Sequence, residues 1–450
     1  MNPLRGGSRP EIRLFLALVS TIAACGGGDD STTTSTGGGG TEDAGNVVGD
    51  GGPVADASSD APLSTDAGAD VDAAGPPKCT FVDGSMHPAI AAMAANLGGG
   101  QSLATSMANS GVPGLSVAVR DVDGKIYAAV FGNANNQSFD SLAPPLSPTT
   151  LFQAGSISKA VTALAYHSSM GSAALNAVDI RATVASFVVP PYAITPADLL
   201  SHAAGTAPHG FAGGYVDTDP LPTTQQIVLG ESPATSPAVT FDAGKVGVFQ
   251  YSGGGLILFQ AWHEQLTGTP HATFVHDNLF VAAGTKRSHF IQPLTKALDH
   301  DAACGKSYNL TNAGLCRKVY PELAAAGLWT TPSELACMAD HVATKRKDVL
   351  AVVTSRALAV DFDNGNYPQK MGLGLFHRPA NGIDETEGHM FEHSGVNEGF
   401  LSWMVFFDDG RAIVAMDNGY AAQGGISAFS VRALCRELKW PCEGKNLAVK

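Results

Sequence analysis

The segment Phe152-Gln153-Ala154-Gly155-Ser156-Ile157-Ser158-Lys159 is followed by Ala160-Val161-Thr162-Ala163-Leu164-Ala165, a run that favours helix. Ser156 is therefore expected at a helix N-terminus, with Lys159 one turn later on the same face. A serine hydroxyl is a weak nucleophile until a neighbouring base takes its proton, and a buried lysine of lowered pKa can do so. The pattern predicts a catalytic serine and lysine. A capping serine beside a surface lysine is the alternative, although no other lysine of the chain has a serine three residues before it.

A second motif, Tyr251-Ser252-Gly253-Gly254-Gly255, ends a predicted loop and opens the apolar run 256–259. Glycines allow a tyrosine to approach another backbone closely. Its phenol could carry protons if a nearby ammonium lowers the pKa of the phenol. A core tyrosine next to a turn is the alternative interpretation.

A third motif, His393-Ser394-Gly395, precedes the predicted strand 401–407. A small residue on an edge strand lets a substrate carbonyl pair with the backbone. The N–H groups of Val396 and Ser156 could then form an oxyanion hole for a tetrahedral intermediate. The alternative is a histidine in a turn.

Hairpin signals lie near both ends of the folded part. Paired apolar runs flank short Asp/Gly turns at 114–119 and 125–131, and again at 400–407 and 411–416. A helical pattern follows at 428–438. These patterns predict an α+β fold, with one antiparallel sheet built from both chain ends and flanked by helices. A mostly helical lobe is expected to be inserted between the two halves of the sheet.

The order of the three motifs resembles that of the penicillin-recognising serine enzymes, and in particular the class C β-lactamase-like family. Residues 152–159 are similar to the family's nucleophile segment, and the segments Leu199–Gly205 and Tyr320–Pro332 are similar to two others. The resemblance covers about residues 86–440 and implies a β-lactamase/transpeptidase-like fold. This family also contains D-alanyl-D-alanine carboxypeptidases, D-aminopeptidases and esterases.

The resemblance implies a role for each motif residue. Ser156 would be the acylated nucleophile, Lys159 the adjacent ammonium or base, and Tyr251 the proton carrier. Whether Lys159 or Tyr251 is the acylation base stays open. His393 would take the place of the family's more usual lysine, with Ser394 and Gly395 lining the edge strand. The reaction would pass through an acyl-enzyme, without a metal or other cofactor.

Two departures from the family pattern bear on the substrate. Gly253 stands where the β-lactamases have an asparagine that binds the acylamino group of penicillins. His393 replaces lysine, and a neutral imidazole attracts a carboxylate less than an ammonium does. We therefore expect a serine hydrolase acting on an ester or amide, esterase- or D-peptidase-like. The alternatives are a genuine class C-like β-lactamase and a non-catalytic penicillin-binding-type lipoprotein that serves as a sensor or binding module.

Several aromatic and histidine residues lie near these motifs in sequence. His202 is interpreted as a packing histidine. The Gly-rich loop that follows holds His209, Phe211 and Tyr215, which either rim the pocket or serve the fold alone.

The N-terminus resembles an exported lipoprotein. Residues 1–25 combine a basic start with an apolar run at 14–24, which is too short to span a membrane, and end at Cys25. Of the 53 residues from 26 to 78, 41 are Gly, Ala, Ser, Thr or Asp, which predicts a disordered linker. We expect a lipidated Cys25, this linker, and a catalytic domain at 79–450, in the bacterial cell envelope. The outer membrane is favoured, on its periplasmic or its surface side. An ordinary signal peptide with a chance cysteine is the alternative.

The charge of the chain limits its partners. The net charge is −14, of which −9 lies in residues 26–78, and no basic run is present. Nucleic acid is therefore excluded as a partner, because phosphate binding needs clustered Lys and Arg. The expected partners are a small ester, amide or peptide substrate and, through Cys25, a membrane. The protein is expected to be a monomer.

Six cysteines remain besides Cys25, an even number that is compatible with three disulfides in an exported protein. Fifteen connectivities are possible. Local loop closure favours Cys304–Cys316 and Cys435–Cys442, which would leave Cys79 with Cys337.

Overall fold

A computed structural model describes residues 79–82, 85–134, 145–211, 213–306, 316–360, 369–380, 388–419 and 425–442. These residues belong to one compact unit. Cys25, the predicted signal sequence and the predicted linker 26–78 lie outside the described residues. Within the ranges given above, no helix has the length and apolar character needed to cross a membrane.

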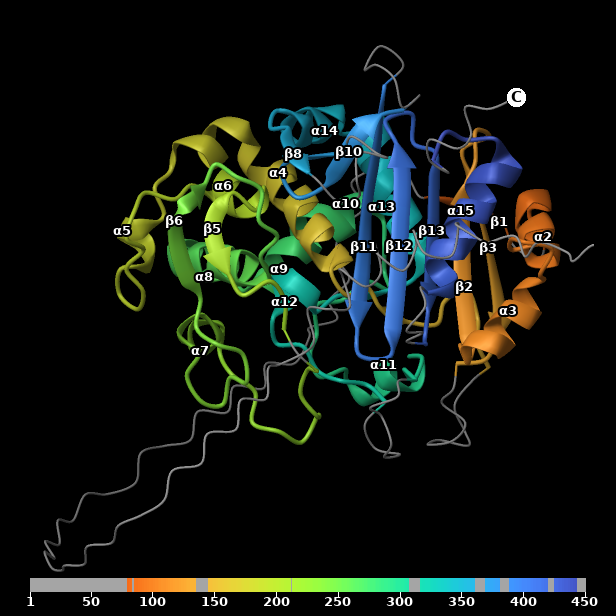
Figure 1. The fold of residues 1–450 in the computed structure, drawn as a ribbon, viewed down its shortest axis with the longest axis horizontal. Coiled ribbons are helices and arrows are strands. Elements are labelled where there is room, and N and C mark those ends of the chain that lie inside the picture. The colour runs from red at the N-terminus through yellow and green to blue at the C-terminus, as the bar shows by residue number, and fades with distance from the viewer. Residues whose placement is uncertain are drawn as a thin grey trace, which may run out of the picture. The chain divides into compact units, whose positions relative to one another are not determined.

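Nine strands of the described residues form the main sheet, in the order β1-β3-β2-β13-β12-β11-β10-β9-β8 (Figure 1). They are β1 (Thr80–Val82), β2 (Gly114–Arg120), β3 (Lys125–Gly132), β8 (Leu358–Val360), β9 (Gln369–Met371), β10 (Phe376–Pro379), β11 (His389–Asn397), β12 (Phe400–Phe407) and β13 (Ala412–Asp417). Only β1 and β3 are parallel among these described neighbours. Since β2 pairs with β13, both ends of the chain contribute to one sheet, as predicted.

Both predicted hairpins are present. β2 pairs with β3, and β12 pairs with β13. Their turns contain Gly124 and Gly410, whose φ angles of +79° and +93° lie in the region that favours glycine. β11 forms a further hairpin with β12 through a two-residue turn at Glu398 and Gly399. The third sequence motif therefore lies within a strand, as the resemblance implies, and not in a turn, which was the alternative.

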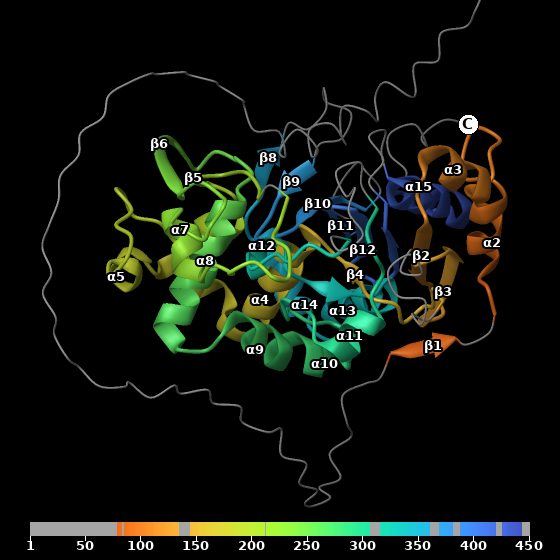
Figure 2. The same cartoon turned by 90° about the horizontal axis from the view of Figure 1, so that it is seen from below.

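Helices cover both faces of the sheet. One face packs against α2 (Pro88–Ala95), α3 (Leu103–Ser110) and α15 (Ile426–Leu438), and the other against α4 (Ile157–Ala177) and α13 (Pro332–Thr344) (Figure 2). Neighbouring residues Phe406 and Phe407 of β12 enter the two opposite cores, because side chains alternate along a strand. A strand buried on both faces explains the continuous apolar run at 400–407.

The chain between β3 and β8 forms the mostly helical lobe that the sequence predicts. A third core lies within it, lined by α4, α6 (Pro196–Leu200), α7 (Thr224–Leu229) and α8 (Gly253–Thr267). The other elements between β3 and β8 pack partly in the lobe and partly against the sheet. They are α5 (Arg181–Val184), α9 (His271–Val275), the π-helix η2 (His276–Phe280), α10 (Val281–Ala283), α11 (Lys296–His300), α12 (Leu323–Ala326), α14 (Lys347–Thr354), the strand pair β4 (Phe152–Gln153) and β7 (Trp329–Thr330), and the pair β5 (Ala204–Ala207) and β6 (Thr240–Val246).

Helix α4 belongs to both the sheet core and the lobe core. Val161 and Leu164 pack toward the sheet, whereas Ala163 and Tyr166 pack into the lobe. The N-terminus of α4 is thereby fixed at the junction of the two, next to β11.

Three disulfides join the six cysteines of the described ranges. They are Cys79–Cys337, Cys304–Cys316 and Cys435–Cys442, the set that local loop closure favours. The first connects the start of the domain to α13.

Candidate active site

Ser156 occupies the N-cap position of α4, as the sequence predicts. Its side chain makes no capping hydrogen bond, so the alternative of a capping serine is not what the structure shows. All residues from 151 to 167 are buried except Ser156, which is partly exposed. Its hydroxyl is therefore the one group of this segment that a solute can reach.

Lys159 lies one turn along α4 and contacts the serine directly. Its Nζ donates hydrogen bonds to Ser156 Oγ at 3.0 Å and to the carbonyl of Ala325 in α12 at 2.7 Å. Lys159 is 3% exposed, which makes it a buried ammonium rather than a surface lysine. The bond to Ala325 therefore holds Nζ in place beside the serine.

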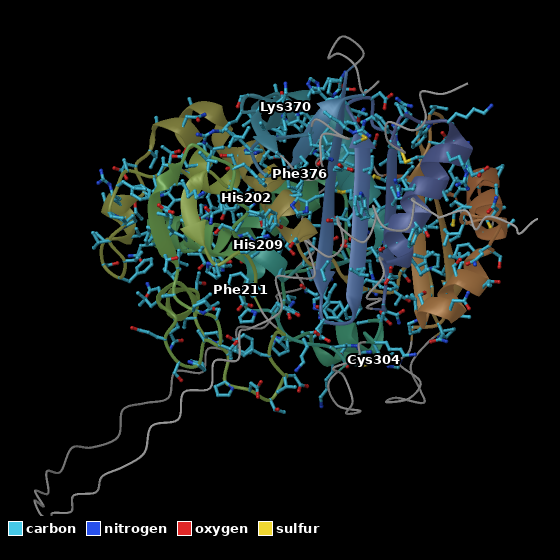
Figure 3. All side chains as sticks on the ribbon, in the orientation of Figure 1. His202, His209, Phe211, Cys304, Lys370 and Phe376 are labelled. Atoms are coloured by element: carbon cyan, nitrogen blue, oxygen red, sulfur yellow. A yellow bond between two sulfur atoms is a disulfide. The ribbon has the colours of Figure 1, made fainter. Side chains whose placement is uncertain are left out.

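Tyr251 lies beside the same ammonium. Its ring centroid is 5.1 Å from Lys159 Nζ. His202 stacks on the tyrosine at 4.4 Å between ring centroids, and the exposed His209 lies at 4.7 Å. Figure 3 labels both histidines in the helical lobe, on the side that faces β11. The first two sequence motifs are therefore brought together.

His393 lies on β11 and is also near the tyrosine, at 6.2 Å between ring centroids. It is 2% exposed, and burial together with the nearby Lys159 lowers its pKa to about 3. Its Nδ1 donates a hydrogen bond to the carbonyl of Ser394 at 2.6 Å. The ring is therefore neutral at pH 7, and its proton is on Nδ1. Among the described residues, Nε2 of His393 has no hydrogen-bond partner.

The third motif lies along an open stretch of strand edge. β10 begins at Phe376, which pairs with Glu392, so the residues of β11 that follow Glu392 have a strand, β12, on one side only. Asn397 and Phe400 flank the two-residue turn, and hydrogen bonding alternates along an antiparallel pair from there. The N–H of Val396 therefore points away from β12, toward α4.

Glycine allows α4 and β11 to come this close. Gly155 has a φ of +52°, and a Cβ placed on it would lie 2.6 Å from the nitrogen of Val396. A Cβ on Gly395 would overlap the carbonyl oxygen of Ala154. The two N–H groups that were predicted to form an oxyanion hole, on Ser156 and Val396, consequently lie at one contact between the helix and the strand.

Gly253 is closely packed, and its surroundings leave no room for an asparagine side chain. It is the first residue of α8, and its N–H donates to the carbonyl of His209 at 2.7 Å. A Cβ added here would lie 2.9 Å from the ring of Phe211. The aromatic side chain thus fills the space that the family's asparagine would occupy. Tyr215, by contrast, is buried and accepts a hydrogen bond from the N–H of Thr235.

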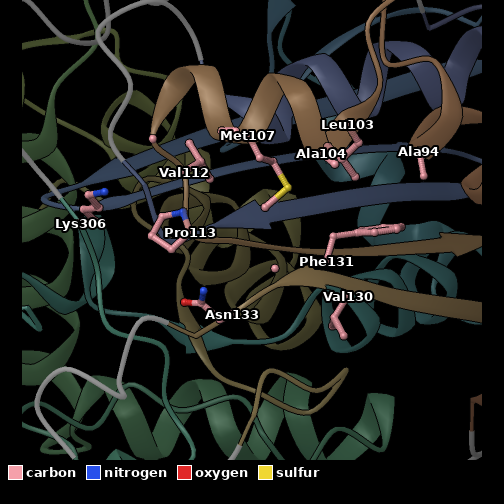
Figure 4. A pocket seen from close by; sticks show the side chains of 13 residues that line it. Ala94, Leu103, Ala104, Met107, Val112, Pro113, Val130, Phe131, Asn133 and Lys306 are labelled. Atoms are coloured by element: carbon pink, nitrogen blue, oxygen red, sulfur yellow. The ribbon is translucent and has the colours of Figure 1, made fainter.

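A hollow outlined by described residues lies away from the motif residues. It has a volume of about 770 Å³ and lies between α3 and β3, with Leu103, Met107, Phe131 and Lys306 among its lining residues (Figure 4). None of the motif residues line it. Within the described ranges, no group of three His, Cys, Asp or Glu side chains could hold a metal ion.

A family model described as Beta-lactamase matches residues 101–422, which is more than half of the chain. The chain belongs to the Beta-lactamase family. The match includes all three motifs of this family member and both halves of its sheet. No curated protein is a match for the sequence.

Solved structures share the fold of this Beta-lactamase family member. The octameric penicillin-binding protein homologue from Pyrococcus abyssi is similar with a TM-score of 0.59 and 21% identity, over 75% of this chain and 76% of that one. D-amino acid amidase from Ochrobactrum anthropi SV3, complexed with D-phenylalanine, has a TM-score of 0.58 and 18% identity over 75% and 97%. A D-stereospecific amidohydrolase from Streptomyces sp. has a TM-score of 0.54 and 16% identity over 77% and 97%.

Some members of the site were not predicted. The carbonyl of Ala325 acts through the backbone, so its residue type carries no signal. His202 was interpreted as a packing residue, although the segment Leu199–Gly205 that contains it was singled out by resemblance. His209 was one of three loop residues considered for the rim, and it does lie beside Tyr251.

Proposed function

We propose that the protein is a serine hydrolase that cleaves an ester or amide through an acyl-enzyme, as esterases and D-peptidases do. One observation carries the proposal. Lys159 Nζ, bonded to a main-chain carbonyl on one side, donates to the partly exposed hydroxyl of Ser156 and lies against the ring of Tyr251. A lysine that only stabilises the fold does not need contacts with both an accessible serine and a tyrosine.

In the proposed reaction, Ser156 Oγ attacks the carbonyl carbon and its proton passes to the Lys159–Tyr251 pair. The carbonyl oxygen becomes negative and accepts hydrogen bonds from the N–H groups of Ser156 and Val396. Collapse of the tetrahedral intermediate breaks the ester or amide bond. The pair returns its proton to the departing alcohol or amine, and Ser156 keeps the acyl group. Water then attacks the acyl-enzyme, the pair accepts a proton from it, and the acid is released.

The surroundings of the serine favour a substrate without a carboxylate beside the reacting bond. His393 is neutral at pH 7 and so supplies no positive charge at the position where the family's lysine stands. Phe211 fills the space of the missing asparagine. Both features favour simple esters and amides over penicillins. Two structures of similar fold are described as a D-amino acid amidase and a D-stereospecific amidohydrolase, which makes amides of D-amino acids reasonable first candidates.

Intact-protein mass spectrometry tests the proposal directly. The protein is incubated with a panel of activated esters, D-amino-acid amides and β-lactams, and the mass of any covalent adduct is measured beside turnover. We expect an adduct on the wild type and none on a folded Ser156→Ala variant. Absence of both adduct and turnover across the panel would favour the non-catalytic binding module. Rapid turnover of penicillins would instead favour a genuine β-lactamase.

We also propose that the domain is carried by an exported lipoprotein anchored through Cys25. Support comes from the three disulfides, since disulfides persist in exported proteins and are rare in the cytosol. The membrane fraction of cells that express the full chain should contain it, and a Cys25→Ala change should move it out of that fraction. An unchanged distribution would contradict the anchor.

A further inference from the structure

The segment that carries Tyr251 has no regular secondary structure. It connects β6 to α8, and residues 249–252 belong to neither a helix nor a strand. The proton transfer proposed above nevertheless needs the phenol at a fixed place beside Lys159 and Ser156. Contacts from elsewhere in the chain must therefore hold this segment.

His202 supplies three such contacts, one on each side of the tyrosine in sequence and one on its ring. Its carbonyl oxygen accepts the N–H of Gln250 at 2.7 Å. Its Nδ1 accepts the N–H of Ser252 at 3.0 Å. Its ring stacks on Tyr251 at 4.4 Å, with 28° between the planes. A single residue thus fixes the backbone before and after the tyrosine as well as the tilt of the phenol ring.

The backbone of His202 is strained. Its φ is +55°, and the only other non-glycine residue with positive φ in the described part of the chain is Lys439, which caps α15. L-amino acids avoid this region, because Cβ approaches the following carbonyl oxygen. Such strain persists where the surrounding structure requires it, often at functional sites.

The protonation state of His202 suits this arrangement. An imidazole nitrogen that accepts an N–H carries no proton, so the proton of the neutral ring is on Nε2. Burial, the nearby Lys159 and two other histidines hold its pKa well below the ordinary value. The ring therefore stays an acceptor at neutral pH. Nε2 is buried without a hydrogen-bond partner among the described residues. The position of the ring therefore satisfies Nδ1 and the contact with Tyr251, but not Nε2.

From these contacts we infer that His202 is a positioning residue for Tyr251, which places the phenol for proton transfer. The inference rests on the proposed function. His202 does pack, as the sequence interpretation had it, and the ring it packs against is that of the proposed proton carrier.

Two substitutions divide the contacts of His202. His202→Asn keeps a side-chain acceptor for Ser252 N–H and tolerates positive φ, but removes the ring. His202→Phe keeps a ring to stack on Tyr251, but removes the acceptor. Each should lower kcat for hydrolysis of a p-nitrophenyl ester by roughly 10- to 100-fold, because small misplacements of a catalytic group are costly. KM should change little, since the phenol acts after binding.

His167 offers a matched control. Like His202, it is buried and has one ring nitrogen bonded to the main chain and the other without a partner in the described residues. The bond of His167 goes to the carbonyl of Leu373. Its pKa is lowered to about 4, mainly by burial. A His167→Gln variant should keep kcat within about threefold of the wild type, because loss of a buried histidine alone does not displace the phenol.

A double-mutant cycle with Tyr251→Phe separates positioning from a general structural effect. If His202 acts through the phenol, His202→Asn should cost less than about threefold in the Tyr251→Phe background, since residues acting as a unit are non-additive. An equal loss in both backgrounds would overturn the inference, as would a kcat unchanged in both His202 variants. The proposed function fails separately, when the wild type itself forms no adduct and turns over no ester.

Discussion

The nucleophile turn and the tyrosine segment are held in place by different means. Ser156 and Lys159 lie one turn apart on a long helix, so helix geometry alone sets their spacing. Tyr251 lies in an irregular segment, and its position depends on His202, which is 49 residues earlier in the chain. A motif within one helix can be interpreted from sequence, whereas a motif in a loop gains its meaning from distant residues.

The largest expected effect compares the two regions directly. Lys159→Met should lower kcat/KM for a p-nitrophenyl ester by about 10³-fold or more, within the range for loss of an acid–base group, because Lys159 bonds to the attacking oxygen. Tyr251→Phe should cost less, about 10²-fold, because the buried ammonium would still bond to the serine. Steady-state kinetics checks the order. A larger loss for Tyr251→Phe would make the tyrosine segment the dominant one and identify the phenol as the base.

Two glycines, one just before α4 and one within it, test the contact between the nucleophile turn and β11. Gly155 and Gly171 both have positive φ, at +52° and +67°, but only a Cβ on Gly155 would meet the backbone at Val396. Gly155→Ala should lower kcat by about 10²-fold, because the two oxyanion N–H groups would be forced apart. Gly171→Ala places a side chain at positive φ (φ 67°, ψ 167°) in open space, so it should lower stability by about 1–3 kcal/mol and leave kcat close to wild type.

Thermal unfolding and kinetics of both variants decide this point. A Gly155→Ala enzyme with full activity would show that the close approach of α4 and β11 is unnecessary. Equal losses of activity in the two variants would assign the effect to the helix and not to the contact.

The smallest effect concerns acid stability. Buried His393 and His167 have pKa values lowered to about 3 and about 4. Below pH 6.5 the unfolded chain binds protons that the folded protein does not, so the free energy of unfolding should decrease as the pH falls from 7 to 5. His167→Gln and His393→Gln should each weaken this dependence, by roughly 1–2 kcal/mol.

Urea unfolding at pH 7 and pH 5 measures the change. The two variants should differ in activity, because only His393 lies at the site. Equal pH dependence in wild type and variants would contradict the lowered pKa values. A normal kcat in His393→Gln would remove that histidine from the site.

Much of the fold followed from local patterns in the sequence. Asp/Gly turns such as the one at Gly410 predicted the two hairpins, and the apolar character of the run 400–407 predicted a strand. The third motif was placed on an edge strand only through the family resemblance, because polar residues such as Ser394 interrupt the apolar pattern of β11.

The candidate site was predictable to the extent that its residues act through their side chains. The first two motifs identified Ser156, Lys159 and Tyr251, which the structure brings together. The sequence could not have revealed the role of the Ala325 carbonyl, because a residue of any type could supply it. The role of Phe211 was equally out of reach, because it depends on packing against Gly253 across a loop.

The pairing of β2 with β13 has a consequence for when the protein becomes active. The serine comes from the first half of the chain, while Val396 and His393 come from β11, a strand near its end. Contacts so distant in sequence form late, after the intervening chain is available. On the proposed function, a polypeptide still emerging from the ribosome would carry the nucleophile without its oxyanion hole. Hydrolysis would begin only when the last strands of the sheet have joined the first.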